Sequence, residues 1–206
     1  MYPSIEIVSA AASYPVTVAE IKKQAAIDHS EDDDYITSLL AAATEYVEQA
    51  TGRALITRTL DVRYTGWPCG DRLILPVPPC QSVTHVKYTD STESESTWAS
   101  TNYIVAHDFT APVLSPYPRN AEIVLKWSYS WPTATLSPSW PIVARIVAGY
   151  GSASAVPEPF KHAIKMVVAH WYEHREAVII GSAAAVDSKA VAMGVDALLA
   201  NFRVHQ

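Results

Sequence analysis

The sequence has few cysteines, few charged residues and no excess of basic side chains. Its two cysteines, Cys69 and Cys80, are too few for a disulfide framework; one bridge stays open, and a reduced pair is the expectation. Of the 206 residues, 17% are charged, and 21 acidic against 15 basic side chains give a net charge of −6. Proteins that grip nucleic acid through its phosphates normally show a basic excess or a dense basic patch. The charge balance therefore argues against a nucleic-acid-binding protein.

Long apolar runs are also absent. No stretch approaches the roughly 20 apolar residues of a membrane-spanning helix. The N-terminal residues lack the basic segment of a signal peptide, and Glu6 interrupts their apolar run. We therefore expect no membrane partner and a protein that is made and kept in a cytoplasm. The 49% of hydrophobic residues is nevertheless enough to bury a core, which argues against a disordered chain.

Two helix-start signals stand in the first quarter of the chain. Thr17 and Glu20 have the spacing of a capping box, which predicts a short helix to about Ile27. The acidic run 31–34 places carboxylates where a helix N-terminus carries partial positive charge, and Gly52 supplies a C-cap. The second helix has one apolar side, made of Tyr35, Ile36, Leu39, Leu40, Ala43, Tyr46, Val47 and Ala50. Two antiparallel helices are predicted.

From Leu55 to about Gly149 the pattern changes to that of short strands. β-branched and aromatic residues gather in short runs, and most of the prolines fall between these runs or at their borders. The runs are 56–64, 73–75, 83–88, 103–105, 123–127 and 142–147. This stretch is interpreted as a small antiparallel β-subdomain inserted between helices.

Helical signals return after the strands. Pro157 and Pro159 predict a helix start, because proline is tolerated in the first helical turn. Its buried stripe consists of Phe160, Ile164, Val167, Val168 and Trp171. Residues 181–185 are a small-residue linker, and Val195 to Phe202 again has helical spacing.

The expected fold class is α+β. An antiparallel helical core of three main helices plus a short C-terminal helix carries the inserted small antiparallel β-subdomain. The expected parts are the N-terminal helical core (1–54), the β-subdomain (55–150), the C-terminal core helix (151–180), and a flexible linker with a C-terminal tail (181–206).

One motif could hold a metal. His170, Glu173 and His174 fit the HxxEH pattern of the inverted zincins, and the two histidines lie one turn apart on one helix side, as zinc chelation requires. No third ligand is evident, and short motifs often match by chance. The preferred interpretation is a pair of histidines near a helix C-terminus, partly facing the core. We therefore expect no catalytic residue, no metal and no cofactor.

The segment 128–141 is rich in serine and proline, yet it carries Tyr129, Trp131 and Trp140. Aromatic residues on loops are enriched at protein–protein contacts. Alternatively, the two indole rings fold back over the small sheet. Both interpretations stay open, and stacking on single-stranded nucleic acid ranks behind them because no basic residues are interleaved.

Several stretches, in their order and spacing, resemble one family. They are Thr17-Val18-Ala19-Glu20-Ile21-Lys22, Asp33-Asp34-Tyr35-Ile36, Glu45-Tyr46-Val47-Glu48, Thr51-Gly52-Arg53-Ala54-Leu55, Ala148-Gly149-Tyr150-Gly151 with Val156-Pro157, Ala169 to Glu176, and Gly194 to Leu199 with Arg203. Together they resemble the head–tail connector proteins of tailed bacteriophages, which are adaptor or head-completion proteins. The likeness spans nearly the whole chain.

The resemblance implies a structural protein of the virion neck that is in the host cytoplasm during assembly. It implies a homo-oligomeric, dodecameric ring docked on the portal protein, with a stopper or tail-completion protein on the tail side. DNA would pass through the channel without sequence-specific binding. The family's docking end corresponds here to Leu198, Leu199, Phe202 and Arg203. Loop 128–141 is longer and richer in tryptophan than the family leads us to expect, so Tyr129, Trp131 and Trp140 are candidates for ring or tail contacts.

Two other functions are compatible with parts of the sequence. A zinc-dependent hydrolase would use His170, Glu173 and His174, and would contain stoichiometric metal. An acidic cytoplasmic binding module would stay monomeric and would not associate with a portal.

Overall fold

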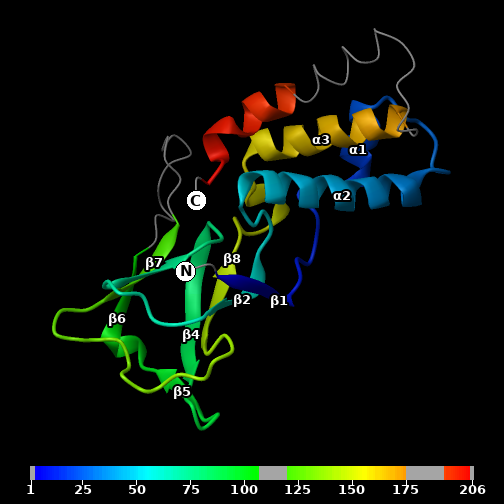
Figure 1. Ribbon diagram of the computed structural model, residues 1–206. Helices are drawn as coiled ribbons and strands as arrows, with labels where there is room; N and C mark the ends of the chain where they lie inside the picture. Colours follow the sequence, from blue (N-terminus) through cyan, green and yellow to red (C-terminus); the bar gives the residue numbers. More distant parts are fainter. Residues whose placement is uncertain (1–2, 107–119, 175–192, 205–206) are drawn as a thin grey trace. The chain divides into compact units, whose positions relative to one another are not determined.

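The computed structural model describes residues 3–106, 120–174 and 193–204 (Figure 1). These residues form two compact units. The β unit contains the described residues of 1–12, 57–106 and 120–150, and the helical unit contains those of 13–56, 151–174 and 193–204. Each unit is described separately below.

The β unit holds two antiparallel sheets. The strands are β1 (Ser4–Ser9), β2 (Arg58–Tyr64), β3 (Arg72–Leu75), β4 (Cys80–Thr89), β5 (Glu95–Trp98), β6 (Tyr103–Ala106), β7 (Ala121–Leu125) and β8 (Ile142–Ala148). A five-stranded sheet has the order β1-β2-β8-β4-β5, and a three-stranded sheet has the order β3-β7-β6. A short 3-10 turn, Ser100–Asn102, precedes β6.

Strict alternation along β8 gives the five-stranded sheet one apolar face. Ile142, Ala144, Ile146 and Ala148 are buried, and the residues between them are only half-buried. One apolar row crosses all five strands, because paired residues in an antiparallel sheet point to the same face. The row runs Ile5, Val62, Ala144, Val86, Trp98.

The two sheets of the β unit contact each other through aromatic side chains. The Tyr64 hydroxyl on β2 donates a 2.6 Å hydrogen bond to the Ile74 carbonyl oxygen on β3. Trp98 on β5 stacks on Tyr103 at the start of β6, with ring centroids 5.0 Å apart. On the three-stranded sheet, Leu73 and Ile123 are buried. Burial of these apolar side chains stabilises the unit.

The helical unit contains α1 (Val18–Gln24), α2 (Asp33–Thr51) and α3 (Glu158–Glu173). The predicted capping box is confirmed: the Glu20 amide donates to the Thr17 hydroxyl at 3.2 Å, and the Thr17 amide donates to the Glu20 carboxylate at 2.8 Å. The predicted C-cap is also confirmed, since Gly52 has a left-handed φ of 68°.

The buried sides of α2 and α3 follow the predicted stripes in part. On α2 the fully buried positions include Ile36, Leu40 and Val47, whereas Tyr46 is exposed.

The last turn of α3 meets the first turn of α2, where the Tyr172 hydroxyl donates a hydrogen bond to the Asp32 carboxylate at 2.6 Å. The short 3-10 turn Ala153–Ala155 precedes α3.

Residues 193–199 form a further helix that continues into the 3-10 turn Ala200–Phe202. This segment packs back on the helical unit. Phe202 contacts Phe160 with ring centroids 4.6 Å apart, and the Phe202 carbonyl oxygen accepts a 2.7 Å hydrogen bond from Arg53. The predicted helical spacing from Val195 to Phe202 thus coincides with a helical segment. The predicted linker 181–185 lies outside the described residues.

The predicted α+β class with antiparallel sheets is confirmed. Two strands were not predicted, β1 and β5. Ser4–Ser9 lies within the stretch 1–54 that the sequence assigned to helices, but it pairs with β2. The expected run 123–127 is shifted, since β7 ends at Leu125 and leaves Trp127 outside the sheet. None of the described helices is both long enough and apolar enough to span a membrane.

Candidate interaction surfaces

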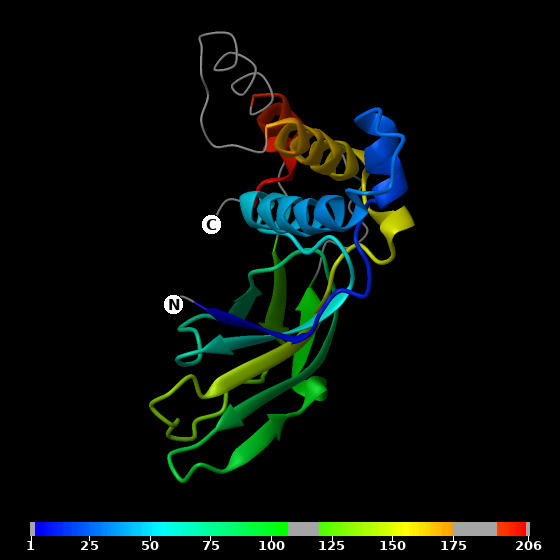
Figure 2. The ribbon, with the colours of Figure 1, turned by 90° about the vertical axis from the view of Figure 1, so that its right-hand side faces the viewer.

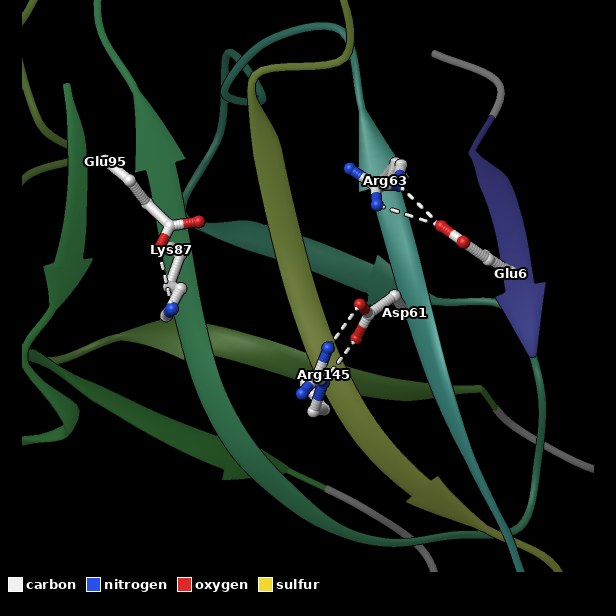
Figure 3. Close-up of polar contacts among 6 residues, drawn as sticks. All are labelled: Glu6, Asp61, Arg63, Lys87, Glu95 and Arg145. Carbon is white, nitrogen blue, oxygen red and sulfur yellow. Dashed lines mark hydrogen bonds and ion pairs between the residues drawn. The ribbon is translucent and has the colours of Figure 1, made fainter. Parts of the chain in front are cut away.

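The outer face of the five-stranded sheet carries charges that neutralise one another (Figure 3). Asp61 lies across from Arg145, and the two form a bidentate pair with both N–O distances at 2.7 Å. Two more pairs flank it, Glu6 with Arg63 at 2.9 Å and Lys87 with Glu95 at 2.6 Å. Because every cation in this group has a carboxylate partner, the face offers no concentrated positive field for DNA phosphates.

Asp61 is the buried member of this group. The hydrogen bonds from Arg145 hold the pKa of the Asp61 carboxyl below its ordinary value, despite the opposing effect of burial. On the neighbouring strand β4, His85 lies directly across from Arg145. Burial, together with the positive charge of Arg145, lowers the pKa of the His85 imidazole. The Asp61–Arg145 pair therefore keeps both of its charges near neutral pH.

The loop 128–141 divides into an inward and an outward part. Trp131 folds back on the β unit: its ring stacks on Trp67 with centroids 5.0 Å apart, and its indole N–H donates to the Gly70 carbonyl oxygen at 2.7 Å. It also contacts Trp98 at 5.0 Å. Of the two interpretations of the loop, folding back describes Trp131.

Tyr129 and Trp140 point outward instead, since both side chains are exposed. Trp140 has a φ of 45°, which is uncommon for a bulky residue. Trp127 is 95% exposed, more than either of them, although it is not among the candidate residues predicted from the sequence. The apolar neighbours Ile123 to Leu125 predict a strand that includes Trp127, and no local signal marks the end of that strand.

The four residues of the predicted docking end have different environments. Leu199 is fully buried, and Phe202 is half-buried against Phe160. Leu198 is half-buried. Arg203 donates to Asp196 at 2.6 Å across the surface of the segment. Leu199 and Phe202 therefore hold the segment to the rest of the helical unit.

The outward side of this segment carries residues that the sequence reasoning missed. Met193, Ala197 and Ala200 are exposed at positions one or two turns apart. The helical period could have found this stripe, because it is the complement of Val195, Leu198, Leu199 and Phe202.

His170 and His174 lie at the end of α3 with ring centroids 4.5 Å apart. His170 is half-buried, while His174 and Glu173 are exposed. The His174 Nδ1 atom lies 3.1 Å from the His170 carbonyl oxygen. Within residues 3–106, 120–174 and 193–204, no three histidine, cysteine, aspartate or glutamate side chains are grouped closely enough to hold a metal ion.

Comparison with known proteins gives one family. The family model described as head completion protein matches residues 16–203. No curated protein matches the sequence.

Solved structures of gene transfer agent (GTA) particles share the fold. A chain in the virion of the native particle has 24% sequence identity and a TM-score of 0.74. Chains in the neck of the empty particle, computed with C6 symmetry, and in the neck of the native particle, computed with C12 symmetry, each have 24% identity and a TM-score of 0.75. In all of them the match covers 98% of this chain and 96% of the other.

Proposed function

Because the chain belongs to the head completion protein family, we propose that it is a structural subunit of the neck that joins the DNA-filled head of a tailed-phage-like particle to its tail. The family match over residues 16–203 carries this proposal, and it agrees with the resemblance to head–tail connectors seen in the sequence. No catalytic role is assigned. The protein acts in the virion neck, after assembly in the host cytoplasm.

The subunit forms a homo-oligomeric ring, which we take to be dodecameric. Support comes from the similar chains in GTA necks, whose structures were computed with C6 and C12 symmetry. DNA passes through the ring without sequence-specific binding. The net charge of −6 and the internally paired charges around Asp61 and Arg145 support this part, because neither provides a phosphate-binding patch.

The C-terminal segment docks on the portal protein. We retain Leu198 and Arg203 as docking residues at the surface, and we assign Leu199 and Phe202 to holding the segment in place. The exposed stripe of Met193, Ala197 and Ala200 extends the docking surface, since it is apolar and nothing in the described residues covers it.

The tail-side stopper or tail-completion protein contacts the outward part of loop 128–141. Tyr129 and Trp140 are exposed aromatic residues, and Trp127 lies just before them. Exposed tryptophan and tyrosine side chains are common anchors of protein interfaces. Trp131 supports this loop from beneath through its stack on Trp67.

The hydrolase alternative has no comparable support. His170 and His174 have no third ligand among the described residues, and the family match is to a head completion protein.

The test is association with the portal ring of the same particle. The purified chain, alone and mixed with portal rings, is measured by light scattering coupled to size exclusion, and the complex is imaged by electron microscopy. A discrete ring of this chain on the portal is the expected result. Failure to associate at any concentration would contradict the proposal.

A matched pair of variants assigns the docking surface. Met193→Glu places a charge on the exposed stripe and is expected to weaken portal binding at least tenfold. Ser82→Glu changes an exposed position on β4 and is expected to leave binding unchanged. Equal binding by both variants would remove the C-terminal segment from the docking surface.

A further inference from the structure

Strand β1 is an exposed edge strand with aliphatic side chains. All six of its residues are exposed, and in the sheet order its one neighbour is β2. Ile5 is 47% exposed, Ile7 is 58% exposed, and Val8 is exposed as well. We call Ile5 and Ile7 the β1 patch; Val8 lies at the irregularity between Ile7 and Ser9 and has no partner in the β2 register.

The β1 patch continues the buried face of its own sheet. Ile5 lies across from Val62 and Ile7 across from Leu60, and both partners are buried. The apolar face therefore extends one strand beyond the part that is covered. Edge strands of this kind are usually protected by charged side chains or proline, or by a covering element. The one charged residue of β1, Glu6, binds Arg63 on the opposite face.

A second uncovered apolar area lies on the outer face of the three-stranded sheet. Ile74 on β3 is 53% exposed and Ile104 on β6 is 54% exposed. Val124 on β7 lies across from Ile104 on the same face and is half-buried. We call these residues the outer-face patch. The Arg72–Glu122 ion pair, at 2.7 Å, lies on the same face and crosses this patch, because Arg72 is directly across from Val124 and Glu122 is directly across from Ile74.

The two patches lie on opposite sides of the β unit. In Figure 1, β1 is at one side of this unit and β6 and β7 are at the other. In Figure 2, turned by 90°, the dark blue β1 is in front and the green strands of the three-stranded sheet are behind it. Both patches belong to one compact unit, so their separation is fixed within the fold of that unit.

A cyclic ring needs this kind of arrangement. Each subunit of a ring with more than two members contacts its two neighbours through two different surfaces that are complementary to each other. Two aliphatic patches on opposite sides of one unit meet that requirement, whereas a β1-to-β1 contact would close a dimer and stop.

We infer that, in the ring proposed above, the β1 patch of one subunit packs against the outer-face patch of the next. This inference rests on the proposed function, because it needs a ring. Two aliphatic side chains on one side and three on the other are fewer than a stable interface of roughly 800 Å² per partner contains. The two patches are thus the apolar anchor of a larger contact.

Cross-linking in assembled particles tests the pairing. Cys69, which is exposed, is replaced by serine, while Cys80 is kept because it is buried and burial raises the pKa of its thiol to about 11, which makes it unreactive. Ile7→Cys and Ile104→Cys are introduced together and separately. Purified particles are treated with a short bis-maleimide, and denaturing gels report the covalent species.

The double variant is expected to give a ladder of oligomers larger than dimers, because every subunit is joined to both neighbours. Each single variant is expected to stay monomeric. Particles assembled from a mixture of the two single variants are expected to give dimers and nothing larger, because each covalent link uses the only cysteine of each chain. Ile7→Cys with Thr84→Cys, an exposed position on β4, is the matched control and should give no ladder.

Particles that contain the chain but give no species beyond dimers with the double variant overturn the inference, as do dimers from either single variant. If the double variant is not incorporated, Ile5→Cys with Ile74→Cys repeats the test on the same two patches. Absence of the wild-type chain from purified particles is a different outcome, and it contradicts the proposed function rather than the pairing.

Discussion

Asp61 and Arg145 are joined by two parallel hydrogen bonds, Oδ1 to Nε and Oδ2 to a terminal guanidinium nitrogen, each 2.7 Å long. The two residues are direct partners on the adjacent strands β2 and β8, and β8 is the central strand of the five-stranded sheet. Bidentate pairs of this geometry are among the stronger hydrogen-bonded contacts in proteins. The pair fixes both side chains in the middle of the outer face shown in Figure 3.

Replacing Asp61 by asparagine should destabilise the protein. The amide keeps the size of the side chain but removes the charge, so one charge-assisted bond to Arg145 is lost at a buried position. We expect the free energy of unfolding to fall by about 1–2 kcal/mol in urea titrations. The control is Glu6→Gln in the exposed Glu6–Arg63 pair, which should cost less than about 0.5 kcal/mol. Equal losses would mean that the buried pair has no special role.

The contribution of Asp61 should also depend on pH. Its folded pKa lies below the ordinary value of 3.8, so the stabilisation is complete above that value and is lost as the pH falls through the lower, folded pKa. The difference in unfolding free energy between wild type and Asp61→Asn should be constant from about pH 8 to about pH 5 and should shrink below about pH 4. A difference that grows on acidification would contradict the assignment.

The contribution of the capping box at the start of α1 to the free energy of unfolding should be measurable. Thr17→Ala removes the hydroxyl that accepts from the Glu20 amide, and we expect a loss of about 1 kcal/mol in unfolding free energy. Thr37→Ala is the matched control, because the Thr37 hydroxyl bonds the Asp33 carbonyl oxygen within a helix and caps nothing. Alanine favours the helix at that position, so no loss is expected there.

Two tryptophans near the same loop should behave in opposite ways. Trp131→Ala removes the ring stacked on Trp67 and should lower the unfolding free energy by about 2–3 kcal/mol. Trp127→Ala removes a ring that is 95% exposed, and its effect on stability should stay within about 0.5 kcal/mol. Thermal unfolding of both variants makes the comparison. A large loss for Trp127→Ala would show that its ring is covered in the folded protein.

Two substitutions in the C-terminal segment should distinguish residues that stabilise the fold from residues that bind the portal. Leu199→Ala creates a cavity in the helical unit and should cost about 2–4 kcal/mol. Met193→Ala changes an exposed side chain of the same helix and should leave the unfolding free energy nearly unchanged. Urea titration of both variants checks this, and portal binding by Met193→Ala is then free of any folding defect. If Leu199→Ala were neutral, the segment would not be part of the core.

Local features were predictable wherever neighbouring residues decide the structure. The Thr17–Glu20 capping box and the Gly52 C-cap need only a few adjacent residues, and both are present. The stripe along α3 and the β-branched runs of the middle of the chain likewise gave the α+β class, because helical and strand periods differ. The family resemblance also lay in the sequence alone, since it depends on the order of short motifs.

Tertiary structure alone decided the features that depend on distant partners. Ser4–Ser9 becomes a strand because β2, more than fifty residues later, pairs with it at Arg63 and Leu60. Trp131 is held inward by a ring and a carbonyl oxygen from residues 67 and 70, whereas the ring of Trp127, four residues away, is 95% exposed. Leu199 is fully buried, and Phe202 of the same segment packs on Phe160 of α3, about forty residues earlier in the chain. Composition and spacing select which residues can be buried, but only the packed chain determines which of them are, because burial depends on surfaces that meet across the sequence.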